Sequence, residues 1–227
     1  MTFHFVTLFP NAFKSYLGES IISRAIKNKK ISAKFYNPRD YTKDKWGRVD
    51  RKPYGGGPGM VLEAESVGRA IEAALKKPKT KIIFFSPSGK QFTNTYAEKL
   101  AKEYKNIVFI CGRYEGIDAR VKKIFKVEEV SVGPYVLTGG ELPAMVVMEA
   151  VTRLLPGTVG KQQSIEDESF KEVRGVARGQ MEKFLEYPHY TRPEKIKING
   201  KIREVPKVLL SDNHKKIEEW RKKNSAI

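Results

Sequence analysis

Apolar residues along the first two thirds of the chain follow two periodicities in turn, which predicts alternating strands and helices. Short runs of aromatic and β-branched residues that end at turn residues are typical of buried strands. The predicted strands cover residues 3–9, 31–36, 81–85, 107–111 and 127–132. Between them, apolar residues recur at three- and four-residue spacing, which predicts helices. The predicted helices cover residues 21–26, 63–75, a segment around 95–104 with a capping box at Thr95 and Glu98, and residues 145–155. The order indicates an α/β domain with a largely parallel sheet.

The composition changes after Leu155, where the chain becomes polar and apolar periodicity is lost over residues 156–169. Beyond this stretch we expect mainly helices, one of them over residues 212–223. We therefore predict an α/β domain over residues 1–160, a flexible linker over 161–175 and a small, mainly helical domain over 176–227.

The chain of 227 residues carries 43 lysines and arginines against 26 aspartates and glutamates, a formal charge of +17. An excess of this size on a folded domain favours nucleic acid as a partner, because each neutralised phosphate releases counterions. A basic surface that only keeps the protein in solution is the alternative. Charge by itself does not separate RNA from DNA, or an enzyme from a binding module.

Several classes of protein are excluded by the composition. The single cysteine, Cys111, rules out an internal disulfide framework and a zinc site built from cysteines. The three histidines are scattered, without the spacing of metal ligands. The first residues lack the pattern of a signal peptide, and no stretch approaches the roughly 20 apolar residues of a membrane span. We expect a soluble, cytoplasmic protein without a membrane partner.

Glycine-bearing segments follow three of the predicted strands: residues 86–89, 112–118 and 133–140. The carboxyl ends of parallel strands lie at one edge of a sheet, where ligands bind. Glycines there let backbone N–H and C=O groups approach a ligand closely. We therefore predict a small-molecule site, with three unrelated tight turns as the alternative. Neither a phosphate-binding P-loop nor the glycine pattern of a Rossmann dinucleotide site is present.

Five separated motifs resemble one family. They are PYGGGPGM (53–60), CGRYEGID (111–118), GPYVLTGGELP (133–143), PHYTRPE (188–194) and VPKVLLSDNHKKIEEWR (205–221). In type, order and nearly end-to-end coverage they are similar to the bacterial tRNA (guanine-N(1)-)-methyltransferases, the TrmD family of SPOUT enzymes. The resemblance implies an α/β domain with a deep trefoil knot, followed by a smaller helical domain. It also implies a homodimer whose active sites are shared between subunits.

The activity implied by the resemblance is methyl transfer from S-adenosylmethionine to ring N(1) of the guanosine at position 37 of tRNA, beside the anticodon. The glycine-bearing loops would form the knot and hold the bent cofactor. The matching positions are Ser86, Pro87, Gly112, Tyr114, Glu115, Gly116, Val132, Gly133, Pro134, Tyr135, Val136, Leu137, Gly139, Gly140 and Pro143. Family members usually have an acidic residue where this chain has Pro134, so one contact would differ.

Two catalytic roles follow from the same resemblance. Arg153 would stabilise the negative charge that grows on guanine O6; a cation favoured by a helix C-terminus is the alternative reading. The general base is a carboxylate in the linker. Register against Ser169 and Phe170 places Glu168 there, whereas the family's aspartate type occurs at Asp167, which also has capping-box spacing from Ser164. We favour Glu168 over Asp167.

The remaining expectations concern the tRNA and a metal. The glycine-rich loop would flank the flipped target base, through Gly55, Gly56, Gly57, Pro58 and Gly59. Phosphate contacts are expected from Arg192, Lys215, Lys216, Arg221 and Lys222. Family members need magnesium, for which Glu115 is the local ligand expected. Residues 171–186 form an insert longer than the family pattern, which leaves the linker's register open.

Two other functions stay open at this point. One is a SPOUT methyltransferase that acts on ribosomal RNA or on a ribose hydroxyl, which would not need a carboxylate base for a ring nitrogen. The other is an RNA-binding scaffold without catalysis, which would bind RNA in a salt-dependent way and would not bind S-adenosylmethionine.

Overall fold

The computed structural model describes residues 1–75, 78–159 and 186–225. Contacts divide the chain into two compact units, residues 1–160 and 161–227. In the described part of the chain, no helix is both long and apolar enough to cross a membrane.

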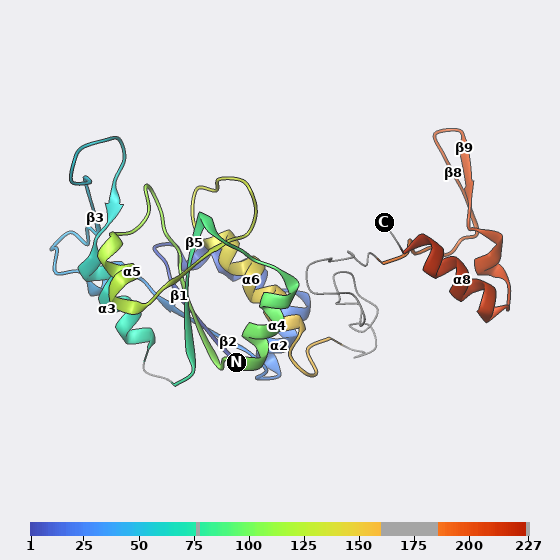
Figure 1. Ribbon diagram of the computed structural model, residues 1–227, viewed down its shortest axis with the longest axis horizontal. Coiled ribbons are helices and arrows are strands. Elements are labelled where there is room, and N and C mark those ends of the chain that lie inside the picture. The colour runs from blue at the N-terminus through green and yellow to red at the C-terminus, as the bar shows by residue number, and fades with distance from the viewer. Residues whose placement is uncertain (76–77, 160–185, 226–227) are drawn as a thin grey trace, which may run out of the picture. The chain divides into compact units, whose positions relative to one another are not determined.

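A sheet of five parallel strands lies at the centre of the first unit, in the order β2-β1-β6-β5-β7 (Figure 1). Its strands are β1 (Thr2–Val6), β2 (Ser32–Tyr36), β5 (Thr80–Gln91), β6 (Asn106–Ile110) and β7 (Glu128–Ser131). The central strand β6 is buried along its whole length, as expected of a parallel strand covered on both faces. The predicted α/β class with a largely parallel sheet is confirmed.

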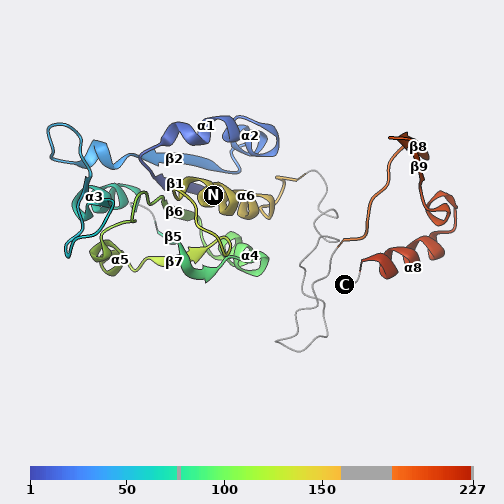
Figure 2. The ribbon, with the colours of Figure 1, turned by 90° about the horizontal axis from the view of Figure 1, so that it is seen from above.

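Helices cover both faces of this sheet (Figures 1 and 2). On one face lie α3 (Ala64–Ala74) and α5 (Ala119–Phe125). On the other lie α2 (Ser20–Lys27), α4 (Asn94–Glu103) and α6 (Glu141–Arg153). The shorter elements of this unit are η1 (Pro10–Phe13), α1 (Lys14–Leu17), η2 (Pro38–Tyr41), β3 (Asp50–Arg51) and β4 (Val61–Leu62).

The alternation of side chains along the strands builds two hydrophobic cores, one on each face of the sheet. Phe3 and Phe5 of β1, with Phe109 of β6, pack into the core beneath α2, α4 and α6. Val108 and Ile110, the intervening residues of β6, pack into the core beneath α3 and α5. Because successive side chains of a strand point to opposite faces, one apolar run supplies both cores.

Strand β5 differs from the prediction. It was expected to end at Phe85, and it continues to Gln91. Phe85 and Lys90 both pair with Val130 of β7, so the residues between them form a bulge within one long strand. Gly89 passes so close to β7 that a Cβ atom there would lie 2.5 Å from the Val130 nitrogen. The glycine permits this approach, which the local apolar pattern did not reveal.

Two local predictions around the helices were wrong. The N-cap of α4 is Thr93, whose side chain accepts a hydrogen bond from the Tyr96 N–H at 3.2 Å, and not the predicted pair of Thr95 and Glu98. Helix α5 was not predicted at all. It is seven residues long and is capped by Asp118, which accepts a hydrogen bond from the Arg120 N–H at 2.9 Å.

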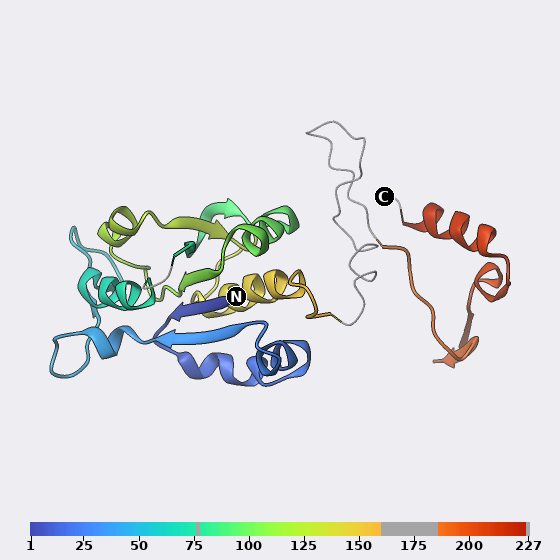
Figure 3. The same cartoon turned by 90° about the horizontal axis from the view of Figure 1, so that it is seen from below.

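The described residues of the second unit contain a hairpin, labelled β8 and β9 in Figure 1, besides the helix drawn in dark red in Figure 3. Strands β8 (Lys195–Ile198) and β9 (Lys201–Glu204) pair antiparallel and are followed by η3 (Lys207–Leu210) and α8 (His214–Asn224). The expectation of a mainly helical domain needs this correction for residues 186–225. Asn199 and Gly200 join the strands with positive φ angles of 50° and 74°, the backbone geometry that an Asn-Gly hairpin turn requires.

Candidate active site

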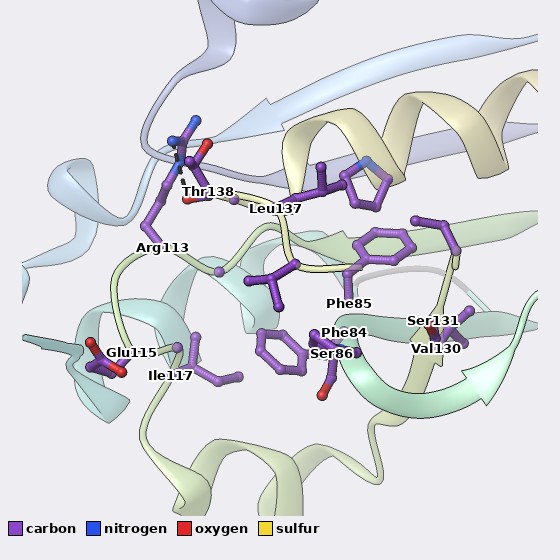
Figure 4. Close-up of a pocket in the computed structure, with 18 of the residues that line it drawn as sticks. Phe84, Phe85, Ser86, Arg113, Glu115, Ile117, Val130, Ser131, Leu137 and Thr138 are labelled. Atoms are coloured by element: carbon purple, nitrogen blue, oxygen red, sulfur yellow. Dashed lines mark hydrogen bonds between the residues drawn. The ribbon is translucent and has the colours of Figure 1, made fainter. Parts of the chain in front are cut away.

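One pocket of about 270 Å³ lies at the carboxyl ends of β6 and β7, beside the bulge of β5 (Figure 4). The glycine-bearing segments that follow β6 and β7 line it together with the bulge, although they stand far apart in the sequence. Its wall is apolar at Ile117, Leu137 and Pro143 and carries backbone polar groups between them. Concave sites with apolar walls and a few polar groups are typical of small-molecule binding.

The pocket gathers nearly all the residues predicted to contact a cofactor. Those that line it are Ser86, Pro87, Gly112, Tyr114, Glu115, Gly116, Val132, Gly133, Tyr135, Val136, Leu137, Gly139, Gly140 and Pro143. Pro134 is not among the lining residues. The sequence analysis missed further lining residues: Phe84, Phe85, Arg113, Ile117, Lys122, Val130, Ser131 and Thr138. Arg113, Ile117 and Thr138 stand inside the quoted motifs, whereas the two phenylalanines reach the pocket beside the unpredicted bulge.

Glycine is required at Gly140, where two parts of the chain meet backbone to backbone. A Cβ atom at this position would lie 2.6 Å from the Cα of Cys111. The Gly140 N–H donates a hydrogen bond to the Gly112 carbonyl at 3.0 Å, which joins the end of β6 to the start of α6. The two loops therefore form one wall of the pocket.

The buried carboxylate of Glu141 connects the same loops through contacts with two other side chains. One of its oxygens lies 2.9 Å from Nη2 of Arg113, and the other accepts a hydrogen bond from the Thr7 hydroxyl at 2.8 Å. Arg113 also donates a 3.4 Å hydrogen bond to the Thr138 carbonyl, drawn in Figure 4, and its guanidinium lies 4.5 Å from the ring centre of Phe9. These contacts join the ends of β1 and β6 to the loop that follows β7.

The glycine-rich loop adjoins the pocket through Glu115. The Glu115 N–H donates to the Met60 carbonyl at 3.0 Å, and a Cβ atom on Gly59 would lie 2.5 Å from the Glu115 carboxylate. A Cβ atom on Gly55, Gly56 or Gly57 would meet nothing within 4 Å, and these three glycines stand outside the lining together with Pro58. The loop thus presents an open backbone next to a carboxylate at the pocket.

Arg153, the predicted catalytic arginine, is not among the residues that line this pocket. Arg153 is the last residue of α6, whereas the lining residues Gly140 and Pro143 stand at its beginning. Ten residues of helix separate Pro143 from Arg153, or about 15 Å at 1.5 Å per residue. Glu168 and Asp167 lie outside the described residues.

The chemistry that the pocket supports depends on which nearby side chains can act as a nucleophile or hold a metal ion. Burial raises the pKa of the Cys111 thiol well above its ordinary value, and the nearby Glu141 carboxylate acts in the same direction. The thiol therefore stays protonated at neutral pH and is no nucleophile. Among the described residues, no group of three histidine, cysteine, aspartate or glutamate side chains is placed to hold a metal ion. Of the residues that line the pocket, Glu115 alone carries a carboxylate.

The second unit has an aromatic and basic pocket of its own, of about 870 Å³, in which Arg192 takes part. Tyr190 packs edge-on against Trp220 of α8 with ring centres 6.2 Å apart, and Arg221 lies 4.9 Å from the ring centre of Tyr187. Lys215, Lys216 and Lys222 are exposed on α8. The two motifs quoted from this part of the sequence therefore pack against each other.

Comparisons with known proteins agree over the whole length. The sequence profile of the family described as "tRNA (Guanine-1)-methyltransferase TrmD" matches residues 1–227. A tRNA (guanine-N(1)-)-methyltransferase of Carboxydothermus hydrogenoformans is 44% identical over 227 residues, covering 100% of this chain and 83% of the relative. Proteins of the same name from Pseudoalteromonas atlantica and Bacillus subtilis are 45% and 44% identical, covering 98% and 99% of this chain and 79% and 87% of the relatives. With the pocket lined by two of the five motifs that carried the resemblance, we conclude that the chain belongs to the TrmD family of tRNA (guanine-1)-methyltransferases.

Proposed function

We propose that the protein transfers a methyl group from S-adenosylmethionine to N(1) of the guanosine at position 37 of tRNA, in the cytoplasm. The observation that carries the proposal is the meeting of the β5 bulge and the loops after β6 and β7 around one pocket, in a chain that matches the family throughout. The same segments would form the trefoil knot of a SPOUT enzyme.

The residues of the pocket fit S-adenosylmethionine by their chemistry. The glycines of the lining would let the donor approach the backbone closely, and Leu137 and Pro143 would supply an apolar wall for the adenine. Glu115 would attract the positively charged end of the donor. When bound there, the cofactor supplies a methyl group on a sulfonium, which leaves as a neutral thioether.

Proton removal is the chain's own main contribution to the chemistry. Guanine N(1) bears a proton at neutral pH and is a poor nucleophile until a base removes it. Glu168, or Asp167 in the alternative register, would accept that proton as N(1) bonds to the methyl carbon. As the proton leaves, negative charge would grow on guanine O6, where the Arg153 guanidinium would stabilise it. The proton ends on the carboxylate, and the N–H bond is replaced by an N–CH₃ bond.

The distance along α6 supports a homodimer as part of this proposal. The pocket adjoins the start of this helix and Arg153 is at its end, about 15 Å away, farther than an arginine side chain reaches. A second copy would therefore bring Arg153 and the linker carboxylate to the pocket of the first. Leu142 and Val146 are 54% and 46% exposed on α6 and offer apolar surface for such a partner.

The described residues do not form a magnesium site by themselves. Glu115 is one carboxylate, and magnesium bound by one carboxylate keeps most of its waters. We retain Glu115 as the candidate ligand, and no step of the proposed reaction passes through the metal.

The experiment that tests the function combines purified protein, methyl-labelled S-adenosylmethionine and tRNA transcripts with guanine or adenine at position 37. We expect label only in the guanine transcript, and nucleoside mass spectrometry is expected to place it on N(1). A methylated ribose, or labelled ribosomal RNA with unlabelled tRNA, would support the other SPOUT activity instead. RNA binding without any donor binding in calorimetry would support the scaffold.

A further inference from the structure

The segment between η2 and β3 carries an unusually exposed tryptophan. Trp46 is one of two tryptophans in the chain, and it is 73% exposed in a loop that projects away from the sheet (Figure 2). A side chain of this size stabilises a protein most when it is buried, by an amount proportional to the apolar area removed from water. In the described unit, Trp46 contributes little of that stabilisation. Its exposure therefore indicates a surface that contacts a partner.

Hydrogen bonds within the loop hold it in one shape. The Asp44 carboxylate accepts hydrogen bonds from the Trp46 N–H at 2.9 Å and from the Arg48 N–H at 3.2 Å. The Thr42 hydroxyl donates to the Arg48 carbonyl at 3.0 Å and accepts from the Asp44 N–H at 3.1 Å. Val49, fully buried, anchors the end of the loop in the core. Trp46 is thus presented by a preorganised loop, so that little backbone ordering is needed when a partner binds.

Ionisation of Asp44 is part of this arrangement. Partial desolvation opposes the charged form, but hydrogen bonds from the backbone N–H groups of Arg48 and Trp46 and from the Arg48 side chain hold the pKa of Asp44 below its ordinary value. The carboxylate also lies 3.3 Å from Nε of Arg48. The loop therefore keeps its hydrogen bonds at neutral pH.

One cation lies over the indole ring, and others stand near it in the sequence. The Arg48 guanidinium lies 4.9 Å from the centre of the Trp46 ring. Residues 42–52 contain five lysines and arginines against two aspartates. Lys45 and Lys52 are exposed and have no ion-pair partner among the residues described. Apart from the buried Val49, the loop offers no further apolar side chain.

This chemistry favours a nucleic acid over a protein as the partner. A protein interface needs an apolar patch around its anchor residue, and this loop has a single aromatic plane among charges. Proteins bind single-stranded nucleic acid by stacking bases on aromatic side chains and guanidinium groups while cations follow the backbone. The target guanine itself must reach the donor at the pocket, whose lining includes none of residues 42–52. The base on Trp46 would be a different one.

We infer that Trp46 and Arg48 form a stacking platform for an unpaired base of the substrate RNA other than the methylated guanine, while Lys45 and Lys52 contact neighbouring phosphates. This inference rests on the proposed function. It gives the enzyme a second contact with a base in the RNA loop. This contact would make the enzyme selective for the nucleotides around the target.

The first test measures affinity for an anticodon stem-loop RNA with guanine at position 37. Trp46→Ala is expected to weaken binding about 5- to 30-fold, in the range of one lost base stack, whereas Trp46→Phe stays within about threefold. Tyr16→Ala is the matched control, because Tyr16 is an exposed aromatic residue on α1 without a cationic loop around it. The Trp46→Ala variant should keep the salt dependence of the wild type, and Lys45→Ala should reduce it.

The second test identifies the base. Trp220→Phe leaves Trp46 as the single tryptophan, and RNA is expected to quench its fluorescence. Removing the base at one unpaired position of the RNA loop should abolish the quenching. The same abasic RNA should bind Trp46→Ala and the wild-type protein equally, since the pair of changes removes one contact.

Several results would overturn the inference. The first is that Trp46→Ala binds the RNA with wild-type affinity. The second is that the losses from Trp46→Ala and from an abasic RNA add up at every abasic position. The third is that Trp46→Ala dissociates into smaller species in sedimentation, which would assign Trp46 to a contact between copies of the chain. Methyl transfer by the wild type on the same RNA is measured in parallel. Its absence would refute the proposed function, whereas unchanged affinity of Trp46→Ala alongside normal methyl transfer would refute the platform alone.

Discussion

At the scale of single residues, Glu141 illustrates how a charge is tolerated in the core beside the pocket. Glu141 is 4% exposed, and its carboxylate forms an ion pair with Arg113 and accepts a hydrogen bond from the Thr7 hydroxyl. A buried charge without a partner costs several kcal/mol, so the three groups depend on one another. They belong to three separate segments, which makes the contact a tie between loops.

We expect Glu141→Gln to destabilise the protein by about 2–4 kcal/mol, because Arg113 loses its carboxylate in a mostly buried place. The measurement is urea unfolding followed by circular dichroism. The double variant Arg113→Met with Glu141→Leu serves as control and should recover part of the loss, since no unpaired charge remains. A loss below about 0.5 kcal/mol in Glu141→Gln would show that the tie is not structural.

The general base can also be tested residue by residue. Glu168→Gln should bind S-adenosylmethionine as the wild type does and should slow single-turnover methyl transfer by about 10²- to 10⁴-fold, because the amide cannot accept the N(1) proton. Asp167→Asn is the matched control and should keep most of the rate. If Asp167→Asn loses the rate and Glu168→Gln retains it, the base is Asp167.

At the scale of elements, the pocket depends on the close approach between the end of β6 and the start of α6. Gly140 stands at that crossing, and neither strand nor helix has room to retreat because both contribute to the core. The apolar periodicity predicts both elements but carries no information about how near they pass. The spacing of the glycines was the one feature of the local sequence that indicated this close approach.

Gly140→Ala is expected to abolish donor binding in calorimetry and to lower the melting temperature, because its Cβ would lie 2.6 Å from a backbone atom of Cys111. Gly68→Ala in α3 is the matched control. Its Cβ would meet its nearest neighbour, a Phe125 ring carbon, at 3.6 Å, an ordinary contact. That variant should bind the donor normally and gain up to about 1 kcal/mol of stability from helix propensity. Normal donor affinity in Gly140→Ala would contradict the assignment of the pocket.

At the scale of the whole molecule, the proposed function calls for two copies of the chain to complete each active site. The pocket and Arg153 stand at opposite ends of α6, and the linker carboxylate belongs with Arg153 in the sequence. Two copies related by a twofold axis would complete two sites at once, since each gives what the other lacks.

Mixing two inactive variants tests this arrangement. Arg153→Ala lacks the proposed catalytic cation, and Leu137→Trp fills the pocket that Leu137 lines and that we propose holds the donor. After equal amounts are mixed and exchanged, half of the dimers are mixed and have one intact site, so we expect about a quarter of the wild-type activity. The measurement is methyl transfer before and after exchange. A mixture that stays inactive although the subunits exchange would place Arg153 and the pocket of one chain in the same site.

The order of residues was enough to predict the class of the fold and most of the strands and helices of its first unit. The family resemblance indicated most of the pocket wall but missed eight of its residues. Apolar periodicity reports which side chains are buried, and burial decides strands such as β6 and helices such as α3. The hairpin β8–β9 could also have been predicted, because Asn199 and Gly200 separate two runs in which polar and apolar residues alternate. We predicted helices for that region instead.

Which distant segments touch became visible in the folded chain alone. The bulge in β5, the crossing at Gly140, the tie through Glu141 and the shape of the Trp46 loop depend on packing or hydrogen bonds that no local pattern records. The reason is the separation along the chain. Apolar periodicity reports on neighbours three or four residues away, whereas Thr7 and Glu141 form their contact across 134 residues of chain.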